Sequence, residues 1–178
     1  MIFPLFRRSA RPGTISALYG AIVAQARLPA FYRDYGVPDT VDGRFELIVL
    51  HLALVLDRFG EKPGLRSLGQ GVFDLFCRDM DNNLREMGVG DLAVPKQMRR
   101  MGEAFYGRAQ AYREAMAEAD HKALAEALAR DIYGGAPGAR ARRLAAYMRQ
   151  AIAQLKALDE VALAAGAIGF PQPDSIRD

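Results

Sequence analysis

The sequence predicts an all-α fold, a single-domain bundle of six to eight helices around a buried central helix. Apolar residues recur every three or four positions along most of the chain, which is the spacing of one helical face. No segment alternates apolar and polar residues for long enough to form a strand. The 178 residues, of which 51% are hydrophobic and 25% charged, suffice for one domain with a sizeable core.

The composition also excludes several kinds of functional site. A formal net charge of only +3 does not indicate nucleic-acid binding, so no DNA partner is expected. One cysteine, Cys77, and two histidines cannot build an internal disulfide or a Cys/His zinc cluster, and we expect no metal or cofactor. The best apolar run, residues 45–56, is interrupted by Glu46 and His51 and is shorter than the roughly 20 residues of a membrane span.

Residues 1–13 are predicted to form a flexible basic arm, with an apolar tip at residues 2–6 followed by three arginines. Such an arm could touch an anionic membrane surface, so peripheral contact at the inner membrane stays open. The acid-free N-terminal stretch resembles a mitochondrial presequence, but the helical pattern already begins near Ile15. A bacterial cytoplasmic location is the simpler expectation, with the mitochondrial matrix second.

The helical domain is predicted to span residues 14–170. Thr14 is the expected N-cap of a first helix that ends near Arg27. Pro29 then opens a short helix that Gly36 closes.

Residues 37–44, VPDTVDGR, contain three residues of types that cap helices. We predict a structural junction in which Asp42 caps the helix that follows, while Arg44 pairs with a carboxylate such as Asp39. That helix, residues 45–60, is apolar on nearly every side up to Leu56, so it is the predicted central helix.

A helical hairpin is predicted next. An apolar row at helical spacing ends at Gly88, a residue that readily adopts the left-handed conformation of a helix end. Asp91 is a candidate cap for the second helix, and Pro95 suits its first position. We call residues 79–108, which contain this turn, the elbow.

Opposite charges lie on the two sides of the turn. Residues 72–91 carry five carboxylates and two arginines, whereas cations prevail over residues 96–113. Asp81 and Arg85 are spaced to form an i,i+4 ion pair on a helix.

Two further helical rows follow the hairpin. One continues to Ile132, before the glycine-rich loop 134–138. The other begins at Arg140 and predicts one long helix that reaches Ala162. An irregular, proline-containing tail is predicted at residues 171–178.

Catalytic and metal-binding motifs do not match. Residues 79–90 begin like a calcium loop, but Leu84 and Gly90 stand where that loop needs glycine and glutamate. His51 lies among leucines and is better explained as a hydrogen-bonded core histidine than as a ligand or base. With no activated serine and no histidine paired with Cys77, no enzyme is expected.

Several strings resemble the ubiquinol–cytochrome c chaperone family over roughly residues 15–132. They are LYGAIVAQAR (18–27), VPDTVDGRFELIVLHLALVL (37–56), FCRDMDNNLREMGVGDLAVPKQMRRMGEAFYGR (76–108) and AYREAM (111–116). The resemblance is specific, because the elements DGRFE, LREMGVGD, VPK and AFYGR occur in order at suitable spacing. It implies a role in assembling the cytochrome bc1 complex, in which mitochondrial members bind newly made cytochrome b with a small partner protein beside the ribosome's tunnel exit.

The resemblance therefore implies an assembly factor whose client is cytochrome b or an early bc1 assembly intermediate. It leaves open a small partner protein and a ribosome contact. The elbow is the expected client or partner surface, because a glycine turn, opposed charges, methionines and the densest family motif coincide there. The expected surface residues are Asp79, Asp81, Arg85, Glu86, Asp91, Lys96, Arg99, Arg100, Tyr106 and Arg108.

Two other functions compete with this one. A ribosome- or RNA-associated binding module would use the elbow arginines and those of residues 140–143, but no aromatic stacking platform accompanies them. An all-α enzyme on isoprenoid-like substrates would need clustered aspartates, whereas Asp79 and Asp81 point about 200° apart on a helix.

Overall fold

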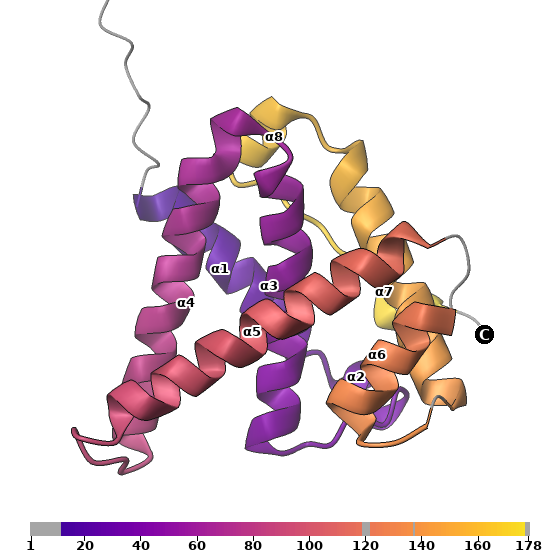
Figure 1. Ribbon diagram of the computed structural model, residues 1–178. Helices are drawn as coiled ribbons and strands as arrows, with labels where there is room; N and C mark the ends of the chain where they lie inside the picture. Colours follow the sequence, from indigo (N-terminus) through magenta and orange to yellow (C-terminus); the bar gives the residue numbers. More distant parts are fainter. Residues whose placement is uncertain (1–11, 119–121, 137, 177–178) are drawn as a thin grey trace, which may run out of the picture.

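The computed structural model describes residues 12–118, 122–136 and 138–176, which form a helical bundle without strands and confirm the predicted all-α class (Figure 1). Most of the predicted arm, residues 1–11, lies outside the described residues. The α-helices are α1 (Pro12–Ala26), α2 (Pro29–Arg33), α3 (Val41–Gly60), α4 (Arg66–Glu86), α5 (Val94–Ala117), α6 (Lys122–Tyr133), α7 (Ala139–Ala157) and α8 (Glu160–Ala164), with 3-10 turns η1 (Pro63–Leu65) and η2 (Pro173–Ser175).

Helix α3 runs through the centre of the molecule, and α1, α4, α5 and α7 pack around it (Figure 1). Of its 20 residues, 13 are buried, which confirms the predicted buried central helix. Because apolar side chains cover nearly the whole circumference of α3, neighbouring helices gain by packing on it from several sides.

The N-terminus of α3 differs from the prediction. The cap is Thr40, whose extended backbone lets its Oγ1 accept a hydrogen bond from Gly43 N at 3.1 Å. Gly43 is required there, because a Cβ would lie 2.0 Å from the Pro38 carbonyl oxygen. The prediction that Asp42 caps this helix is therefore wrong, since Asp42 lies exposed in the first turn.

The other half of the junction has the expected pairing. Arg44 Nε donates to Asp39 Oδ1 at 2.7 Å, and both side chains are more than half exposed. An exposed pair of this kind contributes little to stability, so it orients the surface of the junction more than it holds the fold together.

These contacts predict unequal effects of two alanine substitutions. Thr40→Ala removes the side-chain acceptor that caps the α3 N-terminus and should cost about 0.5–2 kcal/mol of unfolding free energy. Asp42→Ala removes a charge that interacts with the helix dipole and should cost less, about 0.3–1 kcal/mol. Urea denaturation of both variants measures the difference, and a larger loss for Asp42→Ala would contradict the assigned cap.

The turn after α4 is built around Gly88, as predicted. Gly88 has a φ of +83°, in the left-handed region that glycine adopts without steric cost. Val89 N donates to Leu84 O at 3.0 Å, and Gly88 N donates to Arg85 O at 2.9 Å. These two bonds satisfy carbonyls that the end of α4 would otherwise leave unpaired.

The start of α5 differs from the prediction. Asp91 does not cap it, because the Asp91 carboxylate accepts from the Arg85 guanidinium of α4. The N-cap position belongs to Ala93, which has no side-chain acceptor, and Pro95 is the second helical residue rather than the first. The missing N–H of Pro95 removes one donor that a cap would otherwise have to satisfy.

Two other helix ends also differ. α1 begins at Pro12, so Thr14 lies inside its first turn and does not cap it. The long last helix is in fact two helices, since α7 ends at Ala157 and Asp159 caps α8 by accepting from Ala162 N at 2.7 Å.

The described part of the tail, residues 171–176, packs against the helices. Tyr35 Oη donates to Pro173 O at 2.8 Å, and Gln25 Nε2 donates to Pro171 O at 3.0 Å. Both prolines are buried, so this segment covers part of the core next to α1 and α2.

Candidate functional site

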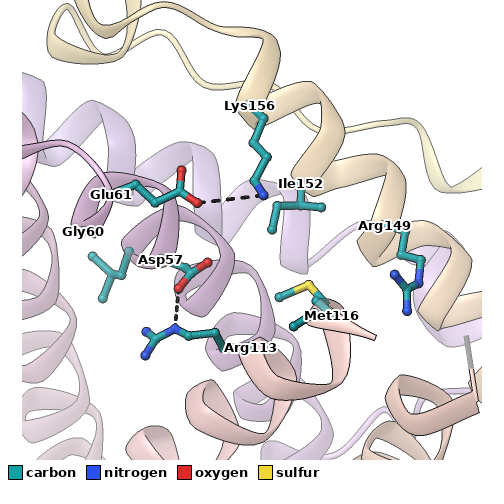
Figure 2. A pocket seen from close by; sticks show the side chains of 10 residues that line it. Asp57, Gly60, Glu61, Arg113, Met116, Arg149, Ile152 and Lys156 are labelled. Carbon is teal, nitrogen blue, oxygen red and sulfur yellow. Dashed lines mark hydrogen bonds and ion pairs between the residues drawn. The ribbon is translucent and has the colours of Figure 1, made fainter. Parts of the chain in front are cut away.

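A surface groove lies beside the C-terminal half of α3 (Figure 2). A larger hollow of about 570 Å³ is formed by the C-terminal ends of α3 and α5 together with α7. A smaller one of about 240 Å³ lies between α3, α4 and α5. The two hollows adjoin, since four residues line both, and together they make up what we call the α3 groove. The residues that line both are Leu56, Asp57, Gly60 and Arg113.

The floor of the α3 groove is apolar. Leu56, Met116 and Ile152 are half-buried, with one side packed on the core and the other lining the larger hollow. Phe73 and Phe105 line the smaller hollow, with ring centroids 5.1 Å apart. The floor is thus the outer edge of the core, built from the apolar rows of these helices.

The rim of the groove is charged, with the cations Arg66, Arg113, Arg149 and Lys156 and the carboxylates Asp57 and Glu61. Arg113 Nε lies 2.5 Å from Asp57 Oδ1, and Lys156 Nζ lies 3.8 Å from Glu61 Oε1 (Figure 2). Arg149 Nη2 donates to the carbonyl of Glu118 at 3.2 Å, at the end of α5. A cation at a helix C-terminus compensates the negative end of the helix dipole.

Of the ten surface residues expected from the sequence, Tyr106 is the one that lines this groove. Its side chain is 63% exposed, and its ring contacts Phe73 and Phe105 at centroid distances of 5.7 and 5.5 Å. The groove itself is not evident from the sequence. The closest indication in the sequence is Met116, the last residue of the apolar row in α5. The structure leaves this side chain half-buried at the groove.

The acidic side of the elbow is tied into the fold. Asp79 is half-buried and accepts a hydrogen bond from Tyr19 Oη at 2.7 Å, which joins α4 to α1. Burial, followed by the hydrogen bond to Asp79, raises the pKa of Tyr19. Asp81 accepts from Arg85 Nε at 2.6 Å in the expected i,i+4 pair, and Asp91 contacts the same guanidinium. These carboxylates therefore have partners inside the chain.

The cationic side of the elbow is more open. Lys96, Arg99 and Arg100 are exposed on the first turns of α5, and Arg99 Nε is 3.9 Å from Glu103 Oε1. Glu86 is exposed at the end of α4. These residues present charge to a partner without any prior rearrangement of the fold.

Two apolar side chains stand out at the turn itself. Leu92 is 99% exposed and Met87 is 56% exposed, close to the exposed cations of α5. Figure 1 shows this turn projecting from the end of the α4–α5 hairpin, away from the rest of the bundle. The elbow thus combines charged and apolar surface at a protruding position.

Arg108 turns inward, which does not fit the exposed role expected of it. Its Nη2 lies 2.5 Å from Glu46 Oε1 of α3, and the two side chains are 22% and 10% exposed. Burial raises the pKa of Glu46 to about 7, although the charge of Arg108 opposes this rise. Glu46 Oε2 is buried without a hydrogen-bond partner in the described structure. The pair fixes α5 against α3.

His51 occupies the core, in agreement with the simpler of its two interpretations. Its Nδ1 lies 2.7 Å from Leu47 O and its Nε2 lies 2.8 Å from Tyr147 Oη. Since a carbonyl only accepts, Nδ1 carries the proton and Nε2 accepts from the tyrosine. Burial lowers the pKa of His51 to about 4, with the Leu47 hydrogen bond opposing this shift. The residue therefore bridges α3 and α7 in its neutral form.

The described residues contain no group of three or more His, Cys, Asp or Glu side chains arranged to hold a metal ion. Among them, no helix is long and apolar enough to cross a membrane. Cys77 is half-buried, and burial raises the pKa of its thiol. The arrangement as described offers binding surfaces: a groove with an apolar floor and a charged rim, and a protruding charged elbow.

Comparisons with known proteins give the chain a family. A family model described as ubiquinol-cytochrome C chaperone matches residues 33–170, which extends beyond the motif strings and through α7 and α8. The crystal structure of the Cbp3 homolog from Brucella abortus is similar with a TM-score of 0.87 and 41% sequence identity, over 99% of this chain and 100% of that one. No curated protein matched the sequence. The chain therefore belongs to the ubiquinol-cytochrome c chaperone family, as its motifs predicted.

Proposed function

We propose that this protein is an assembly chaperone of the cytochrome bc1 complex that holds newly made cytochrome b or an early assembly intermediate. The observation that carries the proposal is the family match over residues 33–170. The likeness to the Brucella abortus Cbp3 homolog over nearly the whole chain supports it and fits a bacterial setting. We place its action in the bacterial cytoplasm, at the surface of the inner membrane where its client is inserted.

We also propose that the open part of the elbow contacts the client or a partner protein. The supporting features are the exposed cations Lys96, Arg99 and Arg100 and the exposed apolar side chains of Met87 and Leu92. Complementary charge steers encounter and orients a bound partner, while exposed apolar surface supplies affinity. Glu86 and Tyr106 are also exposed and belong to this surface. The other expected residues, Asp79, Asp81, Arg85, Asp91 and Arg108, are paired within the chain and hold its shape.

The RNA-binding alternative is not favoured. Arg108 is engaged with Glu46, and Arg143 donates through Nη2 to Ile176 O at 3.1 Å while its guanidinium lies 4.7 Å from the centroid of the Tyr35 ring. Arginines held in this way are not available to a phosphate backbone.

Charge reversal at the elbow tests the proposed surface. Arg99→Glu with Arg100→Glu should change the unfolding free energy by less than about 1 kcal/mol, because both side chains are exposed. The same variant should restore little bc1 complex to a strain that lacks the gene. Assembled complex and cytochrome b level are measured spectroscopically, with circular dichroism as the check on folding.

The matched control is Lys122→Glu with Arg142→Glu, which reverses two exposed cations on α6 and α7 and should restore assembly fully. Full assembly by the folded elbow variant would remove this surface from the proposal. Normal bc1 assembly in the deletion strain itself would reject the proposed function. Co-purification from native membranes would then show whether cytochrome b, a small partner protein or ribosomal proteins accompany the chain.

A further inference from the structure

We propose that the α3 groove is a docking site for an acidic amphipathic helix of a soluble partner protein. The partner's apolar face would lie on the floor of the groove, and its carboxylates would meet the rim. This inference goes beyond the proposed function, because it assigns to the chain a second binding surface, separate from the exposed cations of the elbow. It concerns a partner whose chemistry differs from that of a membrane-protein client.

The floor of the groove requires an apolar face on its occupant. Leu56 of α3, Met116 of α5 and Ile152 of α7 are half-buried and line the larger hollow. Phe73 and Phe105 continue this apolar surface in the smaller hollow, with ring centroids 5.1 Å apart. An occupant that covers these side chains removes their apolar surface from water, which favours association.

The rim of the groove carries more positive than negative charge. The described lining residues include more cations than carboxylates, namely Arg66, Arg113, Arg149 and Lys156 against Asp57 and Glu61. The cations are also the more exposed groups. The side chains of Arg113 and Lys156 are 56% and 55% exposed, whereas those of Asp57 and Glu61 are 19% and 41% exposed. An approaching partner therefore meets a cationic edge first.

The helix ends at the groove account for only part of this surplus. α3 ends at Gly60 and α5 at Ala117, both in the lining, and each C-terminus is equivalent to roughly half a negative charge. Together they offset about one of the two surplus positive charges. The end of α7 has its own cation, since the buried Arg58 donates to Leu155 O at 3.2 Å and to Leu158 O at 3.1 Å. The positive potential that remains favours an occupant with carboxylates.

The rim cations are spread out, which favours a helix with several carboxylates over a fatty acid with one. Arg149 and Lys156 are seven residues apart on α7, so they lie on the same face of the helix about two turns, or roughly 10 Å, apart. Arg113 belongs to α5, and Arg66 stands at the start of α4. A single head group can reach one of these positions, whereas carboxylates two turns apart on a partner helix can meet several. Guanidinium groups match carboxylates through two parallel hydrogen bonds.

The groove also favours a helical occupant over an extended one. Its described walls belong to α3, α4, α5 and α7, whose backbone N–H and C=O groups are bonded within each helix. Such walls offer no sheet edge with which an extended chain could pair. A helix satisfies its own backbone and presents side chains at i, i+3, i+4 and i+7, the pattern of helices that bind in grooves.

The probe is a fluorescently labelled helical peptide with leucines on one face and glutamates beside them at i and i+7. It is titrated against the full chain, and binding is followed by fluorescence anisotropy. It should bind roughly tenfold more tightly than a version with glutamines in place of the glutamates, and a lysine version should bind more weakly still. Raising the salt concentration from about 0.05 to 0.5 M should remove this advantage, because salt screens exposed charges. Equal binding of the three peptides would overturn the inference.

Two exposed rim cations provide the first variant. Arg66→Gln with Lys156→Gln should weaken binding of the acidic peptide roughly tenfold and change binding of the glutamine peptide by less than about twofold. The matched control is Lys122→Gln with Arg142→Gln, which removes two exposed cations of α6 and α7 outside the groove. This control should bind the acidic peptide within about twofold of the original chain. Equal losses in both variants would mean that the peptide responds to net charge alone, and the inference would fail.

Gly60 provides a variant that fills the groove. It lines both hollows, a Cβ built on it meets no atom within 4 Å, and it is not among the described glycines with positive φ. Gly60→Phe should weaken binding of the acidic and glutamine peptides roughly tenfold, whereas Gly60→Ala should stay within about twofold of the original chain. Unchanged binding by a folded Gly60→Phe variant would reject the groove as the docking site.

A second pair of variants applies if Gly60→Phe does not fold. Ile152→Ser removes apolar surface from the floor and should weaken binding of both peptides. Val161→Ser removes an apolar side chain that is 79% exposed on α8, outside the groove, and should leave binding unchanged. Equal effects of these two variants would mean that the peptide binds apolar surface without preference for the groove, which contradicts the inference.

An anionic lipid surface is the competing occupant. Vesicles that contain phosphatidylglycerol are titrated with the same variants, and we expect Arg66→Gln with Lys156→Gln to change vesicle binding no more than its control does. If the rim variant and Gly60→Phe instead abolish vesicle binding while the acidic peptide does not bind, the groove is a lipid site and the inference is wrong. Because purified chain and defined probes are used, such a failure leaves the role in bc1 assembly standing.

Discussion

Replacing Leu52 by alanine is expected to lower the free energy of unfolding by roughly 2–5 kcal/mol, as for buried leucines generally. Leu52 has no exposed surface and lies in the middle of α3, against which α1, α4, α5 and α7 pack. Truncation removes apolar contacts and leaves a cavity that rigid helices on several sides cannot close. Guanidinium denaturation followed by circular dichroism measures the loss.

The control for this prediction is Leu92→Ala, which truncates the same residue type at a position that is 99% exposed. It should change the unfolding free energy by less than about 0.5 kcal/mol. Equal effects of Leu52→Ala and Leu92→Ala would mean that α3 is not the centre of the core.

Replacing Arg108 by alanine should also destabilise the protein strongly, by roughly 3–5 kcal/mol near pH 8, because it leaves the Glu46 carboxylate buried without its cation. The loss should fall toward the lower end of that range, since Arg108 is 22% exposed. Arg108→Ala would therefore lower bc1 assembly because the protein is less stable, and not because client binding is lost. Denaturation midpoints at several pH values separate this reason from a defect in client binding.

The pH dependence follows from the pKa of Glu46, which burial raises from 4.5 to about 7 in the folded protein. Between these two values the folded state binds the proton more tightly than the unfolded state, so stability falls as pH rises through this window. Without Arg108 the pKa rises further, and stability continues to fall above pH 7. The cost of Arg108→Ala should therefore be greater near pH 8 than near pH 5.

Adding Glu46→Gln to Arg108→Ala should recover much of the lost stability at high pH, because the second change removes the buried charge. A loss that is independent of pH and unrelieved by Glu46→Gln would contradict the buried-pair explanation. If Arg108→Ala instead keeps full stability and fails only in bc1 assembly, then Arg108 belongs to the client-binding surface.

Local chemistry made much of the fold predictable from the sequence. Gly88 ends α4 because a left-handed turn is needed there and glycine adopts it freely. The central position of α3 follows from an apolar pattern around its whole circumference. The cap of α3 was misassigned because Asp42 and Thr40 are both capping types two residues apart, and the choice depends on how Gly43 fits against Pro38.

The candidate site was much less predictable. Spacing along a helix reveals which face is apolar but not which distant helix covers it. The sequence placed Asp79 and Arg108 on an exposed surface, yet Tyr19 and Glu46, each about 60 residues away along the chain, draw them into contacts between helices. A long polar side chain can either stay exposed or pair with a group on another helix, and the position of that partner decides between the two.

By itself, therefore, the sequence determined the helices, the buried centre, the glycine turn and the family, because each depends on residues close together in the chain or on motifs read in order. Only the tertiary structure decided which charges are exposed and that a groove exists beside Gly60. The groove is lined by residues of α3, α4, α5 and α7, which are far apart in the sequence. The angles at which helices cross are set by the packing of all their side chains together, and no local pattern contains that information.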